Sequence, residues 1–132
     1  MAALDRPVAK PRPVYLNLFA IRLPMPGFVS FLHRATGALL FVLGIPLLLW
    51  GVERALSSPD AWNAVRTALA HPFAKLVLIV LAWAYFHHFL AGIRHLLLDL
   101  HVGIDLAAAR RSSALVLVLA LVLALAVAVV LW

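Results

Sequence analysis

Three long apolar segments separated by short polar stretches dominate the chain. The first covers residues 28–54 and is interrupted near its start by His33 and Arg34. The second covers 72–99, and the third covers 113–132 without an ionisable side chain. About 20 apolar residues suffice for a helix to cross the hydrocarbon core of a bilayer. The pattern therefore predicts an all-α integral membrane protein with three transmembrane helices.

The polar stretches predict an arm and two loops. Residues 1–27 contain five prolines and four Lys or Arg side chains, a composition that disfavours a regular helix and predicts an extended basic N-terminal arm. Residues 55–71 are expected to form an outer loop, with a short interfacial helix over 61–70. Residues 100–112 form the second predicted loop, which carries Arg110 and Arg111 near its end.

The distribution of cations predicts how the chain crosses the membrane. The arm and the second loop together carry six Lys or Arg residues, whereas the first loop carries Arg54 and Arg66, with Lys75 just inside the second helix. Cytoplasmic segments are enriched in Lys and Arg, so we expect a cytoplasmic N-terminus and a periplasmic C-terminus. The arm resembles neither a signal peptide nor a transit peptide, which favours a bacterial inner membrane. The start of the first helix and the end of the second then share the cytoplasmic leaflet.

Composition narrows the possible classes of protein. Apolar residues make up 66% of the chain and charged residues 12%, against roughly 45–50% and about 25% in soluble domains, which argues against a soluble fold. The absence of cysteine excludes disulfides, thiolate-ligated clusters and cysteine nucleophiles. The net charge of +6 could suggest nucleic acid, but the cations flank apolar segments, so we expect no nucleic-acid partner.

Two further features mark the first predicted helix. Pro46 removes one backbone donor, so we expect a kink or a locally rearranged hydrogen bond in the outer half. Four small residues recur every seventh position, at Ser30, Gly37, Gly44 and Gly51. Such a seam allows a neighbouring helix to approach closely.

A first polar cluster lies at the start of this helix. Ser30, His33 and Arg34 are related by three and four positions and share one broad helical face, with Thr36 nearby. An arginine at this depth can simply extend to the headgroups. The convergence of a hydroxyl, an imidazole and a guanidinium also fits a binding site.

A second polar cluster lies in the last third of the second helix and comprises His87, His88, Arg94, His95 and Asp99. His88 and His95 lie on one face, with His88 roughly 10 Å deeper in the membrane. A histidine at that depth either hydrogen-bonds a backbone carbonyl or serves as an axial haem ligand, with the basic residues near anionic propionates. His87 points about 100° away from His88, so the two cannot ligate one iron. The chain offers no clear second ligand, which points to a partner subunit.

These residues resemble the cytochrome b membrane-anchor subunit of succinate dehydrogenase, respiratory complex II. The family pattern Ser-x-x-His-Arg-x-Ser/Thr-Gly matches residues 30–37, and His-x-x-x-Gly-x-Arg-His-x-x-x-Asp matches residues 88–99. The arm matches the family spacing at Arg12, Pro13, Leu16, Arg22 and Pro24, and an Arg-Ser junction precedes the last helix. Members often carry Tyr where this chain has His87, and the four-residue distance to Gly92 decides between His87 and His88.

The resemblance implies a place in a heteromeric helix bundle. A second small three-helix anchor subunit would share one b-type haem, and both would hold an iron–sulfur subunit and a flavoprotein subunit at the membrane. Electrons would pass from succinate to a quinone of the ubiquinone type. By motif position, His88 is expected to ligate the haem iron. His33, Arg34 and His95 would lie on the propionate side, while Ser30 and Arg34 would contact the quinone.

Two other classes of function compete with this interpretation. A haem-free structural anchor would dock soluble redox subunits and show no visible absorption. A small proton-coupled transporter would use intramembrane histidines as a relay, with ionisable residues across both leaflets. Here the ionisable residues gather in one predicted leaflet, which favours the electron-transfer subunit.

Overall fold

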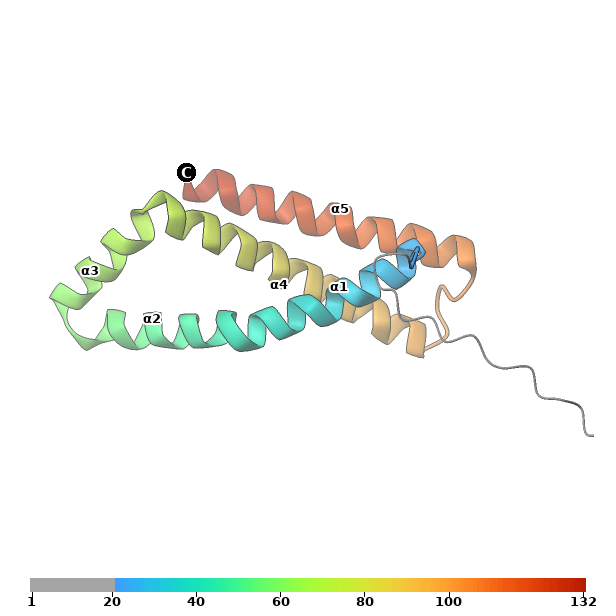
Figure 1. Cartoon of the computed structure of the whole chain (residues 1–132), viewed down its shortest axis with the longest axis horizontal. Coiled ribbons are helices and arrows are strands. Elements are labelled where there is room, and N and C mark those ends of the chain that lie inside the picture. The colour runs from blue at the N-terminus through green and yellow to red at the C-terminus, as the bar shows by residue number, and fades with distance from the viewer. Residues whose placement is uncertain (1–20) are drawn as a thin grey trace, which may run out of the picture.

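The computed structural model describes residues 21–132, and every regular element in that range is helical. The elements run in the order α1 (Met25–Leu39), the π-helical turn η1 (Leu40–Gly44), α2 (Ile45–Ser57), α3 (Pro59–Ala70), α4 (Pro72–Asp99) and α5 (Leu106–Leu131) (Figure 1). Three helical stretches within it are long and apolar enough to cross a membrane: Met25–Ser57, Pro72–Asp99 and Leu106–Leu131. The all-α fold with three membrane-spanning helices is therefore confirmed. Residues 1–20 of the predicted arm lie outside the described range.

The first span stays helical through Pro46 because the backbone widens just before it. A proline ring collides with the carbonyl four residues earlier in a regular α-helix. The turn η1 avoids this collision by π-type bonding, in which the Ile45 amide donates to the Leu40 carbonyl. The expected local rearrangement of hydrogen bonds near Pro46 is thus present.

Several helix ends differ from the expected segments. Helix α1 begins at Met25, inside the proline-rich stretch, because a proline in the first turn lacks only an amide that has no intrahelical partner. Within the expected outer loop, the short helix predicted over 61–70 is present as α3, which begins two residues earlier and whose first turn is capped by the Ser58 hydroxyl. Helix α5 begins at Leu106, well before the apolar run, because Asp105 is followed by alanines and arginines that favour helix.

Helices α4 and α5 form the main packed pair. They run antiparallel, as Figure 1 shows, and small side chains allow a close approach. The buried small residues of the pair are Ala84, Ala91, Ser113, Ala120 and Ala124. Val29 of α1 joins this core against Ala91 and Val116, so α1 rests on both helices.

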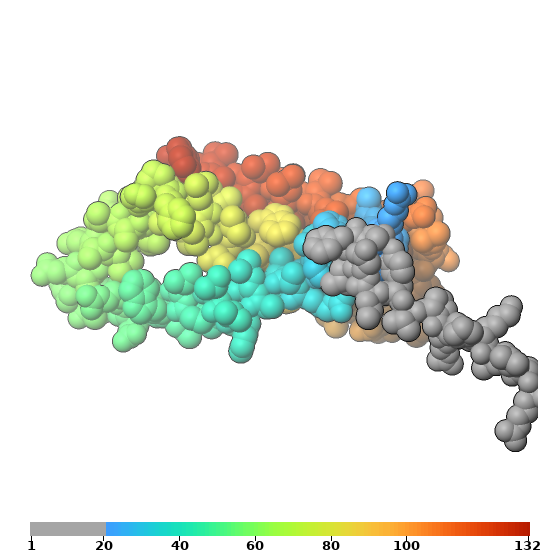
Figure 2. All heavy atoms as spheres, in the orientation of Figure 1, coloured from blue at the N-terminus to red at the C-terminus, as the bar shows by residue number. Residues whose placement is uncertain are grey.

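Helix α2 diverges from this pair. Figure 2 shows an opening between α2 and α4, which are bridged at the far end by α3. The three glycines of the small-residue seam show how far α2 has moved away from α4. A Cβ atom built on Gly37 would collide with His88, one on Gly44 would just reach Leu81 at 3.9 Å, and one on Gly51 would meet nothing within 4 Å. Close approach along the seam therefore occurs at the α1 end and not at Gly51.

Candidate functional site

The two polar clusters predicted from the sequence meet where α1 crosses α4. The imidazoles of His33 and His88 stack with ring centroids 4.2 Å apart and an interplanar angle of 8°. The His33 and His95 rings lie 5.0 Å apart and are tilted by 51°. His33 from α1 thus lies against both members of the His88 and His95 pair on α4, and the three form what we call the histidine cluster.

His88 is held by a backbone group of the neighbouring helix. Its Nδ1 atom lies 3.0 Å from the His33 carbonyl oxygen. A carbonyl can only accept a hydrogen bond, so Nδ1 carries a proton in this arrangement, and in the neutral imidazole the lone pair is then on Nε2. The same carbonyl accepts from the Thr36 hydroxyl at 3.1 Å. This geometry leaves Nε2 chemically available as a ligand atom.

Gly37 makes room for that imidazole. A Cβ atom at this position would lie 2.7 Å from His88 Cε1 and 3.1 Å from Nδ1, closer than side chains pack. At Gly92, by contrast, a Cβ would meet His33 Nε2 at 3.6 Å, an ordinary van der Waals contact. Gly37 and Gly92 both belong to the sequence motifs, but only at Gly37 would a side chain collide with a neighbouring residue.

His87 occupies a different environment from its neighbour. Its side chain is completely buried, and neither ring nitrogen has a hydrogen-bond partner within the described chain. The nearest aromatic ring is that of Trp83, at 5.4 Å. The buried residues of α4, which include His87, Ala91 and Arg94, recur at three- and four-residue intervals on the face that packs on α5. His87 therefore lies outside the histidine cluster.

Ser30 and Arg34 flank His33 on α1. Ser30 is half-buried, and Arg34 is exposed on the next turn. They project from one broad face of the helix near its start, but the structure records no direct contact between them. Together with the histidine cluster they place a hydroxyl, a guanidinium and three imidazoles at one end of the bundle.

Arg94 has a role that sequence reasoning missed. Its Nε donates to the Ser112 hydroxyl at 3.0 Å and its Nη2 to the Ala109 carbonyl at 3.4 Å, both on α5. The side chain is only 6% exposed. The Arg-Ser junction before the third helix was visible in the sequence, but nothing there paired Ser112 with Arg94.

The side chains of this site could supply one ligand to a metal-containing cofactor. Within residues 21–132 no three His, Cys, Asp or Glu side chains converge in a way that could hold a metal ion. The histidine cluster instead stacks its rings and directs one nitrogen, His88 Nδ1, to a carbonyl. Histidine ligands of metals commonly bond their second nitrogen in this way, which fixes the tautomer. The arrangement can therefore offer one imidazole nitrogen of α4, that of His88, as a ligand atom.

Comparisons with known proteins bear on the whole chain. A family model described as the succinate dehydrogenase/fumarate reductase transmembrane subunit matches residues 8–127. The succinate dehydrogenase cytochrome b556 subunit of Paracoccus denitrificans is 34% identical over 102 residues, covering 77% of this chain and 78% of the relative. The subunit of the same name from Coxiella burnetii is 31% identical over 122 residues, covering 92% and 97% of the two chains.

Proposed function

Since the chain belongs to the succinate dehydrogenase/fumarate reductase transmembrane subunit family, we propose that it is the haem b-binding membrane anchor of a succinate:quinone oxidoreductase. The observation that carries the haem assignment is the position of His88, whose Nδ1 bonds the His33 carbonyl while Gly37 leaves space for the ring. A bound haem would accept and pass on single electrons. The second axial ligand would come from a partner subunit.

The surrounding residues complete the proposed haem site. His33 and His95 lie on the side of His88 toward the helix ends, where they would meet the propionates together with Arg34. The enclosed position of His87 supports His88 as the ligand, because a macrocycle outside the chain could not reach a side chain with no exposed surface.

The proposed quinone site lies beside the haem site. A quinone that is being reduced gains negative charge on its carbonyl oxygens, so it needs a hydrogen-bond donor and a nearby positive charge. Ser30 would donate its hydroxyl, and Arg34 would supply a guanidinium that stays charged at any accessible pH. Both lie on α1 next to His33.

The assembly and orientation follow from the same proposal. A second three-helix anchor subunit would cover the apolar surface of this chain, and an iron–sulfur and a flavoprotein subunit would dock at the membrane face near the histidine cluster. The N-terminus would be cytoplasmic and the C-terminus periplasmic in a bacterial inner membrane. Electrons from succinate would then travel a short path to the quinone.

The haem assignment is tested by two adjacent substitutions. In the complex purified in mild detergent, His88→Ala should abolish the sharp reduced-minus-oxidised bands of a bis-histidine haem, whereas His87→Ala should leave them largely intact. His87→Leu is the matched control, because it fills a similar space and removes the two ring nitrogens that have no hydrogen-bond partner within residues 21–132.

The other outcomes have distinct meanings. Exchanged phenotypes would place the ligand at His87. Normal spectra in both variants would remove the haem from α4, and a wild-type complex with no haem bands would favour the haem-free anchor instead. Identification of the companion chains by mass spectrometry tests the proposed partners in the same preparation.

The quinone site is tested by comparing two activities. Ser30→Ala and Arg34→Leu should each lower quinone reduction by about tenfold or more. Succinate oxidation with a soluble artificial acceptor should continue, because that reaction bypasses the site. Ser57→Ala and Arg54→Leu make the same chemical changes at the opposite end of the first span and should leave both activities unchanged. Proportional loss of both activities in Ser30→Ala or Arg34→Leu would indicate a role in assembly.

A further inference from the structure

Arg94 carries a buried charge that the proposed function does not use. The side chain is 6% exposed, and its hydrogen-bond partners on α5 are a hydroxyl and a backbone carbonyl. Both partners are neutral. Within the part of the chain that the structure describes, the guanidinium charge is therefore held by dipoles and not neutralised by an ion pair.

The local structure keeps this charge in place. The Ala109 carbonyl accepts from Arg94 Nη2, from the Ser112 hydroxyl at 3.2 Å and from the Ser113 hydroxyl at 2.7 Å. Ser113 is completely buried. The guanidinium is thus bonded to the first two turns of α5 at two points, which fixes its position relative to α4 and α5.

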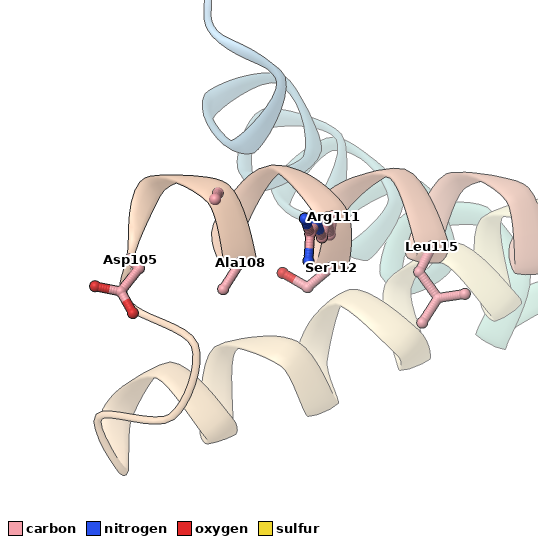
Figure 3. Close-up of a pocket in the computed structure, with 6 residues that line it drawn as sticks. Asp105, Ala108, Arg111, Ser112 and Leu115 are labelled. Carbon is pink, nitrogen blue, oxygen red and sulfur yellow. The ribbon is translucent and has the colours of Figure 1, made fainter.

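The surface beside Arg94 carries an exposed arginine, Arg111, with which the buried charge of Arg94 can be compared. Ser112 also lines a shallow groove of about 670 Å³ on α5, together with Asp105, Arg111 and Leu115 (Figure 3). Arg111 is exposed, so water and salt screen its charge. Arg94 lies behind this surface, where the effective dielectric constant is lower and a charge acts roughly four times more strongly than in bulk water.

Arg94 is also close to the proposed haem ligand along the chain. It precedes His95 directly and lies six residues from His88, a rise of about 9 Å along the axis of the same helix and about 120° around it. We infer that Arg94 is an electrostatic positioning residue whose buried positive charge raises the reduction potential of the haem held by His88. This inference rests on the proposed function. Its physical basis is that adding an electron to the haem lowers the charge of that group, and a nearby cation stabilises the reduced form.

The test measures the haem midpoint potential in the purified complex by spectroelectrochemical titration. Arg94→Gln and Arg94→Met remove the charge, and Met also retains an apolar stem of similar length. Each should lower the equilibrium constant for reduction at least threefold, a shift of about 28 mV at 59 mV per tenfold change. Arg94→Lys keeps the charge and should retain the potential while lowering the thermal midpoint of the complex, because one ammonium cannot replace the forked contact.

Two controls separate charge from structure. Arg111→Gln removes an exposed charge on α5, at the residue that directly precedes the Arg94 partner Ser112, and should not shift the potential. Ser112→Ala removes the hydrogen bond but not the charge and should also leave the potential near the wild-type value.

Three results would overturn the inference. One is a shift in the neutral variants no larger than that of Arg111→Gln. Another is a shift in Arg94→Lys as large as in the neutral variants. The third result applies if Arg94→Gln and Arg94→Met lose their haem. A threefold change in the equilibrium constant for haem reduction in Arg94→Lys would then overturn the inference. A wild-type complex without haem would contradict the proposed function and would be recognised before any variant is measured.

Discussion

At the scale of single residues, the histidine cluster depends on the absence of a Cβ atom at Gly37. The ring of His88 occupies the position where a side chain at residue 37 would begin, 2.7 Å from the site of the missing Cβ. Any larger residue there must displace this ring, which bonds the His33 carbonyl, or separate the two helices. The tautomer and the direction of the imidazole thus depend on a glycine of the facing helix.

A graded series of alanine substitutions tests this dependence. Gly37→Ala should strongly reduce haem content per complex, because overpacking of this kind costs about 1–3 kcal/mol and displaces the proposed ligand. Gly44→Ala should have a small effect, since its nearest contacts are movable leucine side chains. Gly51→Ala, which meets open space, is the matched control and should match the wild type. Equal haem content in all three variants would contradict the close approach of α1 and α4 at Gly37.

At the scale of elements, the connection between α4 and α5 sets how the packed pair turns back on itself. The chain leaves α4 through two left-handed residues, His101 with φ 61° and Gly103 with φ 74°. The Val102 amide donates back to the Leu97 carbonyl at 2.9 Å, which closes the end of the helix. A left-handed backbone is ordinary for glycine but costs other residues free energy, and most of all β-branched ones.

Substitutions at His101 should therefore follow backbone preference. His101→Gly should leave the thermal midpoint of the purified complex unchanged or raise it, and His101→Asn should stay near the wild type. His101→Val should destabilise the complex by about 1–2 kcal/mol. Differential scanning fluorimetry in detergent measures the three midpoints. Equal values for His101→Val and His101→Gly would show that this residue leaves the left-handed conformation in the assembled protein.

At the scale of the whole molecule, the chain buries little of its apolar surface on itself. Only 6% of the most apolar window of the first span is buried, and 17% in each of the other two. Phe41, Leu48, Trp50 and Val130 are among the large side chains that remain more than half exposed. Such surface is stable against lipid chains and against other subunits, which agrees with an anchor that functions inside a larger bundle.

Reporter fusions test the proposed orientation of the whole chain. Alkaline phosphatase, which is active only after export, should be active when fused after Trp132 and inactive when fused after Gly103, beside Arg110 and Arg111. A fluorescent protein that folds only in the cytoplasm should show the reverse pattern. Cytoplasmic activity at the C-terminus would contradict the topology predicted from the Lys and Arg distribution.

The sequence by itself determined the class of the protein and the number of its membrane spans. Hydrophobic runs of sufficient length can be stable only as helices in a bilayer, because the backbone polar groups must be satisfied within each segment. Local rules also predicted a kink or a rearranged hydrogen bond near Pro46, and they placed His88 and His95 on one face, since helical periodicity needs no information about neighbours. The two motifs were enough to suggest the family to which the chain belongs.

Only the tertiary structure decided which faces of the helices contact one another. The 100° offset between His87 and His88 is a property of any helix, but the crossing of α1 over α4 places His88 against Gly37 and leaves His87 enclosed. The same applies to Arg94, whose partner Ser112 lies 18 residues further along the chain. The glycine seam shows the limit of periodicity, because its spacing continues to Gly51 after α2 has diverged from α4. Contacts between helices depend on crossing angles and on the volumes of many side chains together, and no local pattern in the sequence encodes them.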